Sequence, residues 1–291
     1  MFGGSIVAIV TPFKHGQVDE KAFNDLIEWH LSNGTDAIVP CGTTGESATL
    51  EYEEHYRVIE IAVKTVNKRV PVIAGTGANS TDETVMITKK AKKLGADAAL
   101  LVSPYYNKPT QEGLYRHYKA VAEAVKMPLV LYNVPGRTAV NILPATVARL
   151  AEIEDIVAIK EATGDMKQVS EVLRLCGDRI AVISGDDFTT LPLLALGGKG
   201  VISVTANVAP REMSDMCSLW KQGKHDEARA LHYKLEPLHN AMFIETNPIP
   251  AKTALALMGM IRKEFRLPLC EMSGANEEKL SKAIKDFGLI R

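Results

Sequence analysis

A lysine ends a short apolar stretch of the sequence, at Lys160 within residues 156–163. The stretch has the length and composition of a strand that is buried on both faces in a parallel sheet. Because burial of a charged ammonium is costly, this side chain must either find a partner, such as Glu161, or lose its proton. A neutral lysine amine can attack a carbonyl carbon and form a Schiff base. The stretch therefore predicts either a structural lysine, which extends to solvent or pairs with an acid such as Glu161, or a catalytic nucleophile.

Three other groups could act together with such a lysine. Residues 42–46 place consecutive backbone amides beside glycines, which suits a carboxylate or a developing oxyanion, although a tight turn would look the same. Tyr132 could shuttle a proton, or be a buried aromatic residue with a satisfied hydroxyl. Arg137 could hold a carboxylate with its fork of donors, or be a solvated loop charge. Together these groups suit a 2-keto acid that condenses with the lysine, and a second substrate that carries its own carboxylate.

These groups lie at the ends of apolar runs that alternate with segments of helical periodicity. At one helix start, Ser80 and Glu83 form a capping-box pattern. The alternation predicts an α/β fold, a (β/α)8 TIM barrel, in which catalytic groups gather at the C-terminal ends of the strands. A doubly wound sheet would use the same alternation, but residues 75–77 lack the third glycine of a dinucleotide site. The predicted strands are residues 5–10, 37–41, 70–74, 98–102, 129–133, 156–160, 180–184 and 200–204.

After about residue 210 the strand patterns stop and helical patterns follow. We therefore predict a catalytic (β/α)8 barrel over residues 1–222 and a C-terminal helical extension over residues 223–291 that packs on the barrel. The helices expected in this last part are residues 211–222, 226–243, 247–260 and 277–287.

The composition disfavours several classes of protein. The 34 basic and 35 acidic residues leave a net charge of −1, so we expect no nucleic-acid partner. No apolar stretch reaches the about 18 residues of a membrane-spanning helix. The first residues lack the basic leader of a signal peptide, so we expect a cytoplasmic protein without a membrane partner. Asp186 and Asp187 follow the predicted seventh strand, where barrels often bind phosphate, and argue against a phosphorylated substrate.

The cysteines and histidines give no sign of a metal site or a disulfide. Cys41, Cys176, Cys217 and Cys270 are far apart and form no CxxC pair, so we expect reduced packing residues. The seven histidines have no spacing typical of metal ligands. The chemistry that the lysine predicts requires neither a metal nor a redox cofactor.

Over essentially its full length, the chain resembles the family of dihydrodipicolinate synthases (4-hydroxy-tetrahydrodipicolinate synthases). This family belongs to the pyruvate-dependent class I aldolases and lyases, which include N-acetylneuraminate lyase. Each matching motif is modest alone, but together they are highly specific. The motifs that carry the resemblance are residues 42–47 (GTTGES), 104–107 (PYYN), 131–138 (LYNVPGRT) and 159–162 (IKEA).

The resemblance implies a catalytic role for four of these residues. Lys160 would form the Schiff base with pyruvate, and no separate cofactor would be needed. Tyr132, Thr43 and Tyr106 would form a proton relay, with Tyr106 reaching the site of a neighbouring subunit. The family is usually a homotetramer, a dimer of tight dimers.

The resemblance also implies how two substrates are bound. Thr44 and the backbone at Ile202 would contact pyruvate. Arg137 would bind the carboxylate of aspartate semialdehyde. The product would be the cyclic precursor of diaminopimelate and lysine.

Lysine-sensitive members of this family carry a regulatory site at the tight-dimer interface. Tyr52 stands where we would expect a histidine of that site, so the matching set is incomplete. His55 and Glu83 could instead be polar interface or helix-terminal residues. The residues that match the allosteric lysine site are Ser47, Ala48, His55, Asn79, Glu83 and Tyr105.

Two alternatives to the synthase use the same barrel. A related lyase or aldolase would cleave sialic acid or a longer 2-keto-3-deoxy acid through the same imine. A catalytically silent barrel would bind a keto acid as a sensor. Arg137, and threonine rather than serine at Thr43, favour the synthase over its sibling lyases.

Overall fold

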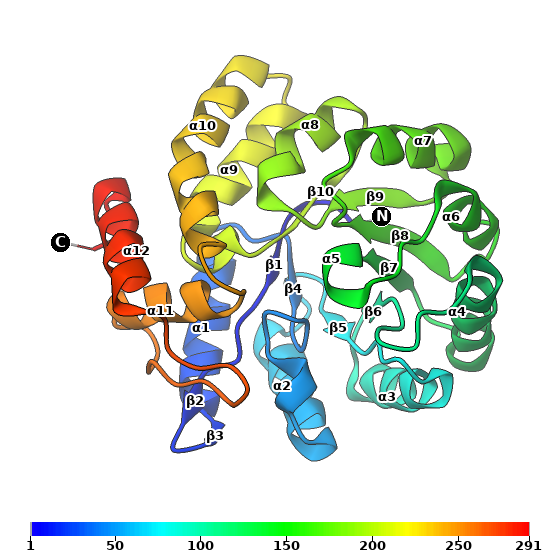
Figure 1. The fold of residues 1–291 in the computed structure, drawn as a ribbon, viewed down its shortest axis with the longest axis horizontal. Helices are drawn as coiled ribbons and strands as arrows, with labels where there is room; N and C mark the ends of the chain where they lie inside the picture. The colour runs from blue at the N-terminus through cyan, green and yellow to red at the C-terminus, as the bar shows by residue number, and fades with distance from the viewer. Residues whose placement is uncertain (1, 291) are drawn as a thin grey trace.

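The computed structural model describes residues 2–290 and contains a barrel of parallel strands surrounded by helices (Figure 1). An isolated parallel bridge between Ile38 and Val72 joins the two ends of the strand order and closes the barrel. The predicted (β/α)8 fold is confirmed. Around the sheet the strands are β4 (Ala37–Val39), β1 (Gly4–Ala8), β10 (Gly200–Ser203), β9 (Ala181–Ser184), β8 (Ile156–Glu161), β7 (Leu129–Asn133), β6 (Ala98–Val102) and β5 (Ile73–Gly75).

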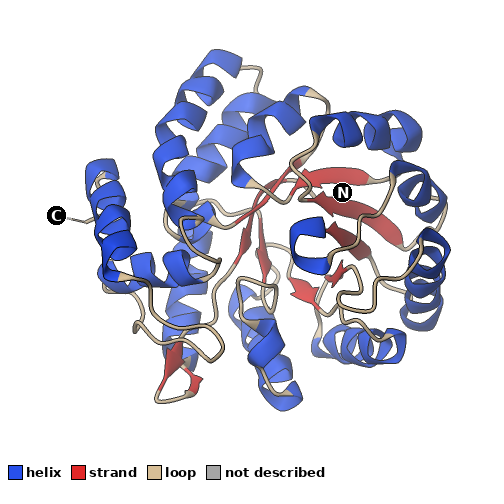
Figure 2. Cartoon of the chain, in the orientation of Figure 1, coloured by secondary structure: helices blue, strands red, loops and turns tan. Residues whose placement is uncertain are grey.

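Helices cover the outside of the barrel between successive strands (Figure 2). One half of the predicted capping box at the start of α3 is present, because the Ser80 side chain accepts a hydrogen bond from the Glu83 amide. The Glu83 carboxylate instead accepts from the Tyr52 hydroxyl. These helices are α1 (Glu20–Ser32), α2 (Tyr52–Val66), α3 (Thr81–Leu94), α4 (Gln111–Val125), α6 (Pro144–Leu150), α7 (Met166–Cys176), α8 (Thr190–Ala195) and α9 (Pro210–Lys221).

Several short elements lack a clear signal in the sequence. The loop expected after β7 contains a helical turn, α5 (Pro135–Thr138), which Pro135 starts with its fixed φ. The third predicted strand starts late, at Ile73, because Pro71 has no amide to donate to the sheet. The other short elements are β2 (Phe13–Lys14), β3 (Gln17–Val18), η1 (Ser47–Thr49), η2 (Gly177–Arg179), η3 (Asp187–Thr189) and η4 (Thr205–Asn207).

The C-terminal extension comprises α10 (His225–Met242), α11 (Ile249–Leu257) and α12 (Gly274–Phe287). It lies beside α9 and α1, on the side of the barrel where β1 and β4 meet (Figure 1). One apolar cluster contains both barrel residues such as Leu26 and extension residues such as Leu255. The extension therefore shares a core with the barrel, and the proposed boundary at residue 222 stays a prediction.

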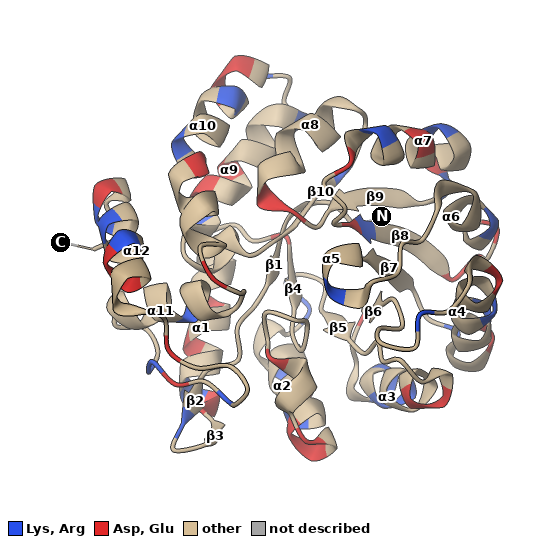
Figure 3. Ribbon diagram, in the orientation of Figure 1, with Lys and Arg blue, Asp and Glu red and all other residues tan. Residues whose placement is uncertain are grey.

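Charged residues lie mainly on the outside of the barrel, and apolar residues fill its interior. Most charged residues lie on the outer helices and loops, while the strands carry few (Figure 3). A second apolar cluster fills the inside of the barrel and includes Ile6, Ile73, Ile183 and Ile202. Within residues 2–290 no helix is long and apolar enough to cross a membrane.

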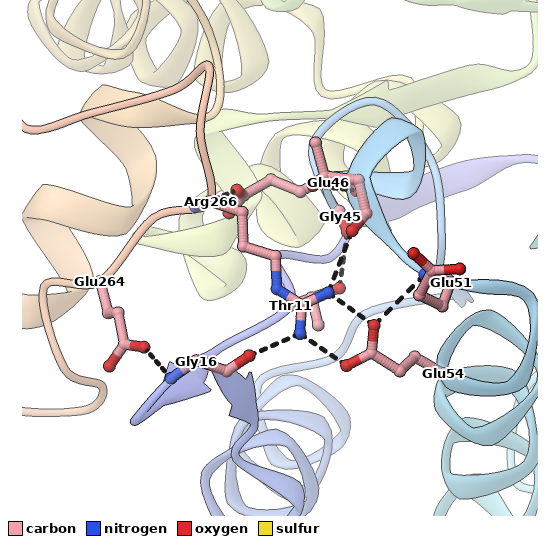
Figure 4. Close-up of polar contacts among 9 residues, drawn as sticks. Thr11, Gly16, Gly45, Glu46, Glu51, Glu54, Glu264 and Arg266 are labelled. Atoms are coloured by element: carbon pink, nitrogen blue, oxygen red, sulfur yellow. Dashed lines mark hydrogen bonds and ion pairs between the residues drawn. The ribbon is translucent and has the colours of Figure 1, made fainter.

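A buried ion pair joins the C-terminal extension to residues 42–46, which we call the glycine loop. Lys252 of α11 pairs with Glu46 at the end of this loop, and both side chains are completely buried. The Glu46 carboxylate also accepts a hydrogen bond from the Arg266 amide at 3.2 Å. The Arg266 guanidinium in turn pairs with Glu54 of α2 at 2.5 Å (Figure 4). The extension thus holds the loop that follows β4.

Replacing Lys252 with alanine should leave Glu46 buried without its cation. Loss of one partner of a buried pair typically lowers the free energy of unfolding by about 3–5 kcal/mol. Urea denaturation of Lys252→Ala measures this loss. Lys282→Ala is the matched control, because Lys282 and Asp286 form an exposed pair on α12 and such pairs contribute less than about 1 kcal/mol. Equal losses in the two variants would contradict the expectation.

Candidate active site

Lys160 lies on the inner face of the barrel wall. In β8 it pairs with Tyr132 of β7 on one side and with Ile183 of β9 on the other. Residues paired across a sheet share a face, and both partners belong to the interior cluster. The lysine is only 4% exposed. Glu161 faces the opposite side, where Gln168 of α7 donates a hydrogen bond to it, so the interpretation of Lys160 as paired with Glu161 is wrong.

The Tyr132 ring lies directly against the lysine amine. The Lys160 Nζ atom is 4.3 Å from the centroid of this ring, and the tyrosine is 7% exposed. On its other side Tyr132 pairs with Val102 of β6, a residue that lines the large cleft described below. The structure therefore brings the predicted nucleophile and the predicted proton shuttle together.

Gly185, directly after β9, makes room for the Lys160 side chain. A Cβ atom at this position would lie 3.0 Å from the Cε and Cγ atoms of Lys160 and 2.6 Å from the Cβ atom of Ala162. The Gly185 amide donates to the Glu161 carbonyl at 2.7 Å, which fixes the loop against β8. Our sequence analysis missed this residue, although a glycine directly after a strand is a recognisable signal of close backbone approach.

The glycine loop offers a row of three free amides followed by two that are bonded within the loop. The Gly45 amide donates to the Gly42 carbonyl at 3.0 Å, and the Glu46 amide donates to the Thr43 carbonyl at 3.1 Å. Among the described residues, the amides of Gly42, Thr43 and Thr44 have no acceptor. The predicted anion nest therefore has three consecutive donors, next to the buried side chain of Thr44.

Arg137 and the glycine loop are held by the same residue, Asn247. The Arg137 guanidinium donates to the Asn247 carbonyl at 3.1 Å. The Asn247 side-chain amide donates to the Thr44 hydroxyl at 2.9 Å, and its own oxygen is buried without a partner. Sequence analysis missed Asn247; the available signal was an asparagine followed by two prolines, Pro248 and Pro250, at a helix start.

A cleft of about 680 Å³ opens over these groups. It reaches from the mouth of the barrel, at Thr43, Arg137 and Asn247, to the start of α2 and α3. Lys160 and Tyr132 do not line this cleft but lie on the interior face of their strands.

Tyr106 and Ile202 take very different positions. Tyr106, in the loop after β6, is 90% exposed and has a left-handed backbone with φ of 73°. It is not among the residues that line the cleft of its own chain. Ile202 in β10 is completely buried in the interior cluster.

The residues that match the regulatory site gather at the far end of the same cleft. Tyr52 also lies there, and its hydroxyl donates to the Glu83 carboxylate at 3.0 Å. His55 is buried and its Nε2 atom lies 2.8 Å from the Gly75 carbonyl; burial lowers the pKa of this imidazole. Asn79 is joined to the group through Asn107, which donates to its carbonyl at 2.8 Å. The matching residues that line the cleft are Ser47, Ala48, His55, Glu83 and Tyr105.

The two acids after β9 have separate roles. The Asp187 carboxylate is buried and accepts hydrogen bonds from the amides of Val204 and Thr205, both at 3.0 Å, which ties together the loops after β9 and β10. Burial raises the pKa of Asp186, and the hydrogen bond that its carboxylate accepts from the Phe188 amide at 3.1 Å opposes that rise.

Substitution of Gly185 by alanine should displace the lysine side chain. Because misplacing a reacting atom by about 1 Å can lower a rate on the order of 100-fold, we expect Gly185→Ala to slow Schiff-base formation by at least tenfold. Borohydride trapping with a 2-keto acid, followed by mass spectrometry, measures the rate. Gly274→Ala is the control, because a Cβ atom there has no neighbour within 4 Å. Unchanged trapping in Gly185→Ala would refute this role of the glycine.

Comparison with known proteins gives one consistent result. Residues 1–287 match the model of the dihydrodipicolinate synthetase family. A 4-hydroxy-tetrahydrodipicolinate synthase of Thermodesulfovibrio yellowstonii is 72% identical over 100% of both chains. The chloride-inhibited dihydrodipicolinate synthase of Acinetobacter baumannii, crystallised with pyruvate, is 54% identical with a TM-score of 0.98 over 100% of both chains. A synthase of Cyanidioschyzon merolae with lysine bound is 43% identical, with a TM-score of 0.96 over 99% of both chains. The chain therefore belongs to the dihydrodipicolinate synthase family.

Proposed function

We propose that this chain condenses pyruvate with L-aspartate 4-semialdehyde to form 4-hydroxy-tetrahydrodipicolinate, the first committed step toward diaminopimelate and lysine. The observation that carries the proposal is the buried Lys160 amine, 4.3 Å from the centroid of the Tyr132 ring at the end of a barrel strand. The activity named for a relative with 72% identity over the full length supports it. The lysine itself supplies the imine, so the reaction needs no separate cofactor.

The chemistry follows from the amine. Lys160 attacks the keto carbon of pyruvate and one water leaves, which gives a protonated imine. This cation withdraws electrons, so the methyl carbon loses a proton and becomes an enamine nucleophile. The enamine carbon attacks the aldehyde of the second substrate and forms the new carbon–carbon bond. The amino group of that substrate then attacks the imine carbon, closes the ring and releases the Lys160 amine.

The proton transfers are assigned to a hydroxyl relay. Tyr132 takes and returns protons beside the imine, and Thr43 passes them along. We assign the last member of the relay to Tyr106 of a neighbouring copy of the chain, because this side chain is 90% exposed and does not line the cleft of its own chain. This relay requires at least a dimer, and we propose a homotetramer built from two such dimers.

Each substrate has its own carboxylate site in this proposal. Pyruvate binds with its carboxylate at the free amides of the glycine loop, close to the Thr44 hydroxyl and the backbone at Ile202. The carboxylate of aspartate semialdehyde binds to Arg137, whose planar guanidinium offers parallel donors. Its bond to the Asn247 carbonyl keeps this side chain at the mouth of the cleft.

Two linked assays test the activity. Borohydride with pyruvate should leave a stable adduct on Lys160, and Lys160→Arg should form none. In a coupled assay with a reductase, Arg137→Ala should lower kcat/KM for aspartate semialdehyde by roughly 100-fold, the typical cost of losing a charge-assisted bidentate contact, while pyruvate still forms its adduct. Cleavage of sialic acid or a 2-keto-3-deoxy acid, without turnover of the semialdehyde, would instead favour the related lyase. A chain that forms no adduct would be a sensor.

We further propose that L-lysine binds at the end of the cleft formed by His55, Glu83 and Tyr105 and inhibits the enzyme. Glu83 supplies a carboxylate for an ammonium group, and the lysine-bound synthase of Cyanidioschyzon merolae supports regulation of this kind. In this chain Tyr52 donates to the same carboxylate at 3.0 Å. A ligand ammonium must share or replace this bond, which weakens the net gain on binding.

Removal of the Glu83 charge should weaken lysine binding. A hydrogen bond to a charged group contributes about 1.5–3 kcal/mol, so Glu83→Gln should raise the Kd for lysine by roughly tenfold or more. Isothermal titration calorimetry on the pyruvate-saturated enzyme measures this. Glu53→Gln, at an exposed position on α2, is the control. Equal affinity in both variants would remove Glu83 from the site, and no binding to the unmodified chain would refute the site itself.

A further inference from the structure

We propose that Glu161, together with Asn133 and Gln168, positions Lys160 and Tyr132 from the outer side of the barrel wall. These three residues lie on the face of the wall opposite Lys160 and Tyr132, so they are positioning residues rather than catalytic ones. The inference rests on the proposed role of Lys160 as the Schiff-base nucleophile. The proposed reaction gives Glu161 no role, and the inference supplies one.

The sheet register links the two sides of the wall. In the pairing of β7 with β8, Tyr132 lies opposite Lys160, and the next pair along is Asn133 opposite Glu161. Successive side chains of a strand point to opposite faces. The first pair therefore faces the barrel interior, and the second pair faces the helices outside.

This register is not continuous along the two strands. It shifts between Leu129 and Val130, because Leu129 lies opposite Ile156 while Val130 lies opposite Ala158. One additional residue of β8, Val157, is accommodated there as a bulge. A slip by one residue would turn the Lys160 side chain out of the barrel. The pairing beyond the bulge therefore needs an anchor at the C-terminal ends of the strands.

The Glu161 carboxylate supplies this anchor. One oxygen accepts hydrogen bonds from the side-chain amides of Asn133 at 3.1 Å and Gln168 at 3.2 Å. The other accepts from the Thr163 amide at 2.9 Å. Glu161 is 2% exposed and Asn133 is completely buried. Burial raises the pKa of this carboxyl, and its hydrogen bonds oppose that rise.

A second layer of amides holds the donors themselves. The side chains of Asn141 and Gln168 form a reciprocal pair, with bonds of 2.8 Å and 3.0 Å. Asn133 donates to Asn141 at 2.8 Å and accepts from the Ile142 amide at 3.0 Å. Gln111 of α4 donates to the Asn141 carbonyl at 2.7 Å. A buried network whose members are all satisfied favours one arrangement of the strands that carry it.

The choice of residue also points to positioning rather than to stability alone. A buried carboxylate surrounded by neutral amides is costly, and apolar side chains of similar size would often fill such a place at lower cost. The carboxylate is instead placed one residue after the nucleophile, where it fixes both strands of the Lys160 and Tyr132 pair.

Glu161→Gln tests the inference in the full-length protein. The variant keeps the size of the side chain but puts an amide donor where two donors already converge. We expect adduct formation with pyruvate, followed by borohydride trapping, to slow by roughly tenfold or more, with less than about a threefold change in KM for pyruvate, because the glycine loop is untouched. Glu171→Gln, an exposed position on the same helix as Gln168, is the control and should match the unmodified enzyme.

Exchange of the Glu161 carboxylate and the Gln168 amide should restore the trapping rate that Glu161→Gln loses. The double variant Glu161→Gln with Gln168→Glu keeps one carboxylate in the cluster and should recover a large part of the trapping rate. Gln168→Ala is the second variant, for the case that Glu161→Gln does not fold. It removes one donor to Glu161 and should lower the trapping rate by a few fold. Trapping at the normal rate in Glu161→Gln, or in Gln168→Ala if only that variant folds, overturns the inference. If the trapping rate of each variant falls only in proportion to its folded fraction, the cluster has a purely structural role and the inference is overturned. If the unmodified chain forms no adduct, the proposed function itself fails, and this inference fails with it.

Discussion

The buried pair of Glu46 and Lys252 is the interaction on which the geometry of the cleft depends. Glu46 has a left-handed backbone, with φ of 54° and ψ of 36°, a conformation that is unfavourable for a residue with a side chain. The pair with Lys252, and the bond from the Arg266 amide, hold the residue there. Because the free amides of the glycine loop stand just before Glu46, the C-terminal extension sets the direction in which they point. The extension is therefore part of the active-site architecture, although it supplies no catalytic group.

On the opposite side of the barrel, too, the residues that react are held in place by residues that do not. Lys160 and Tyr132 act inside the wall, and the polar cluster around Glu161 holds their strands from outside. In both places a buried carboxylate lies beside the residues that bind or react, and at least one of its partners, Lys252 of α11 or Gln168 of α7, comes from a helix outside the ring of strands. Strand ends alone leave the loops free to move, so an active site at the top of a barrel needs such anchors to reach the precision that catalysis requires.

The periodic features of the chain could be predicted from the sequence, and the irregular ones could not. Buried parallel strands are apolar throughout, so the barrel and the position of Lys160 on it follow from local pattern. Gly185 acts through the space that it leaves beside Lys160, and Asn247 acts through contacts with residues more than 100 positions away. Such contacts exist only after the barrel closes. The left-handed backbone of Glu46 likewise depends on its buried partner in α11 rather than on its own preference.

The continuity of the cleft gives the regulatory proposal its physical basis. Thr43 and Thr44 belong to the same short segment as Ser47 and Ala48. The cleft is lined by Thr43 at one end and by Glu83 at the other. A ligand can change the affinity for a second one only if it interacts differently with the states that the second one selects. A contact at Ser47 bears on the loop that carries the free amides, so this coupling needs no path through the barrel core. In the proposed regulation, the bond between Tyr52 and Glu83 limits how much of the carboxylate is left for an incoming ammonium. The tyrosine at this position would then tune inhibition without any contact to Lys160.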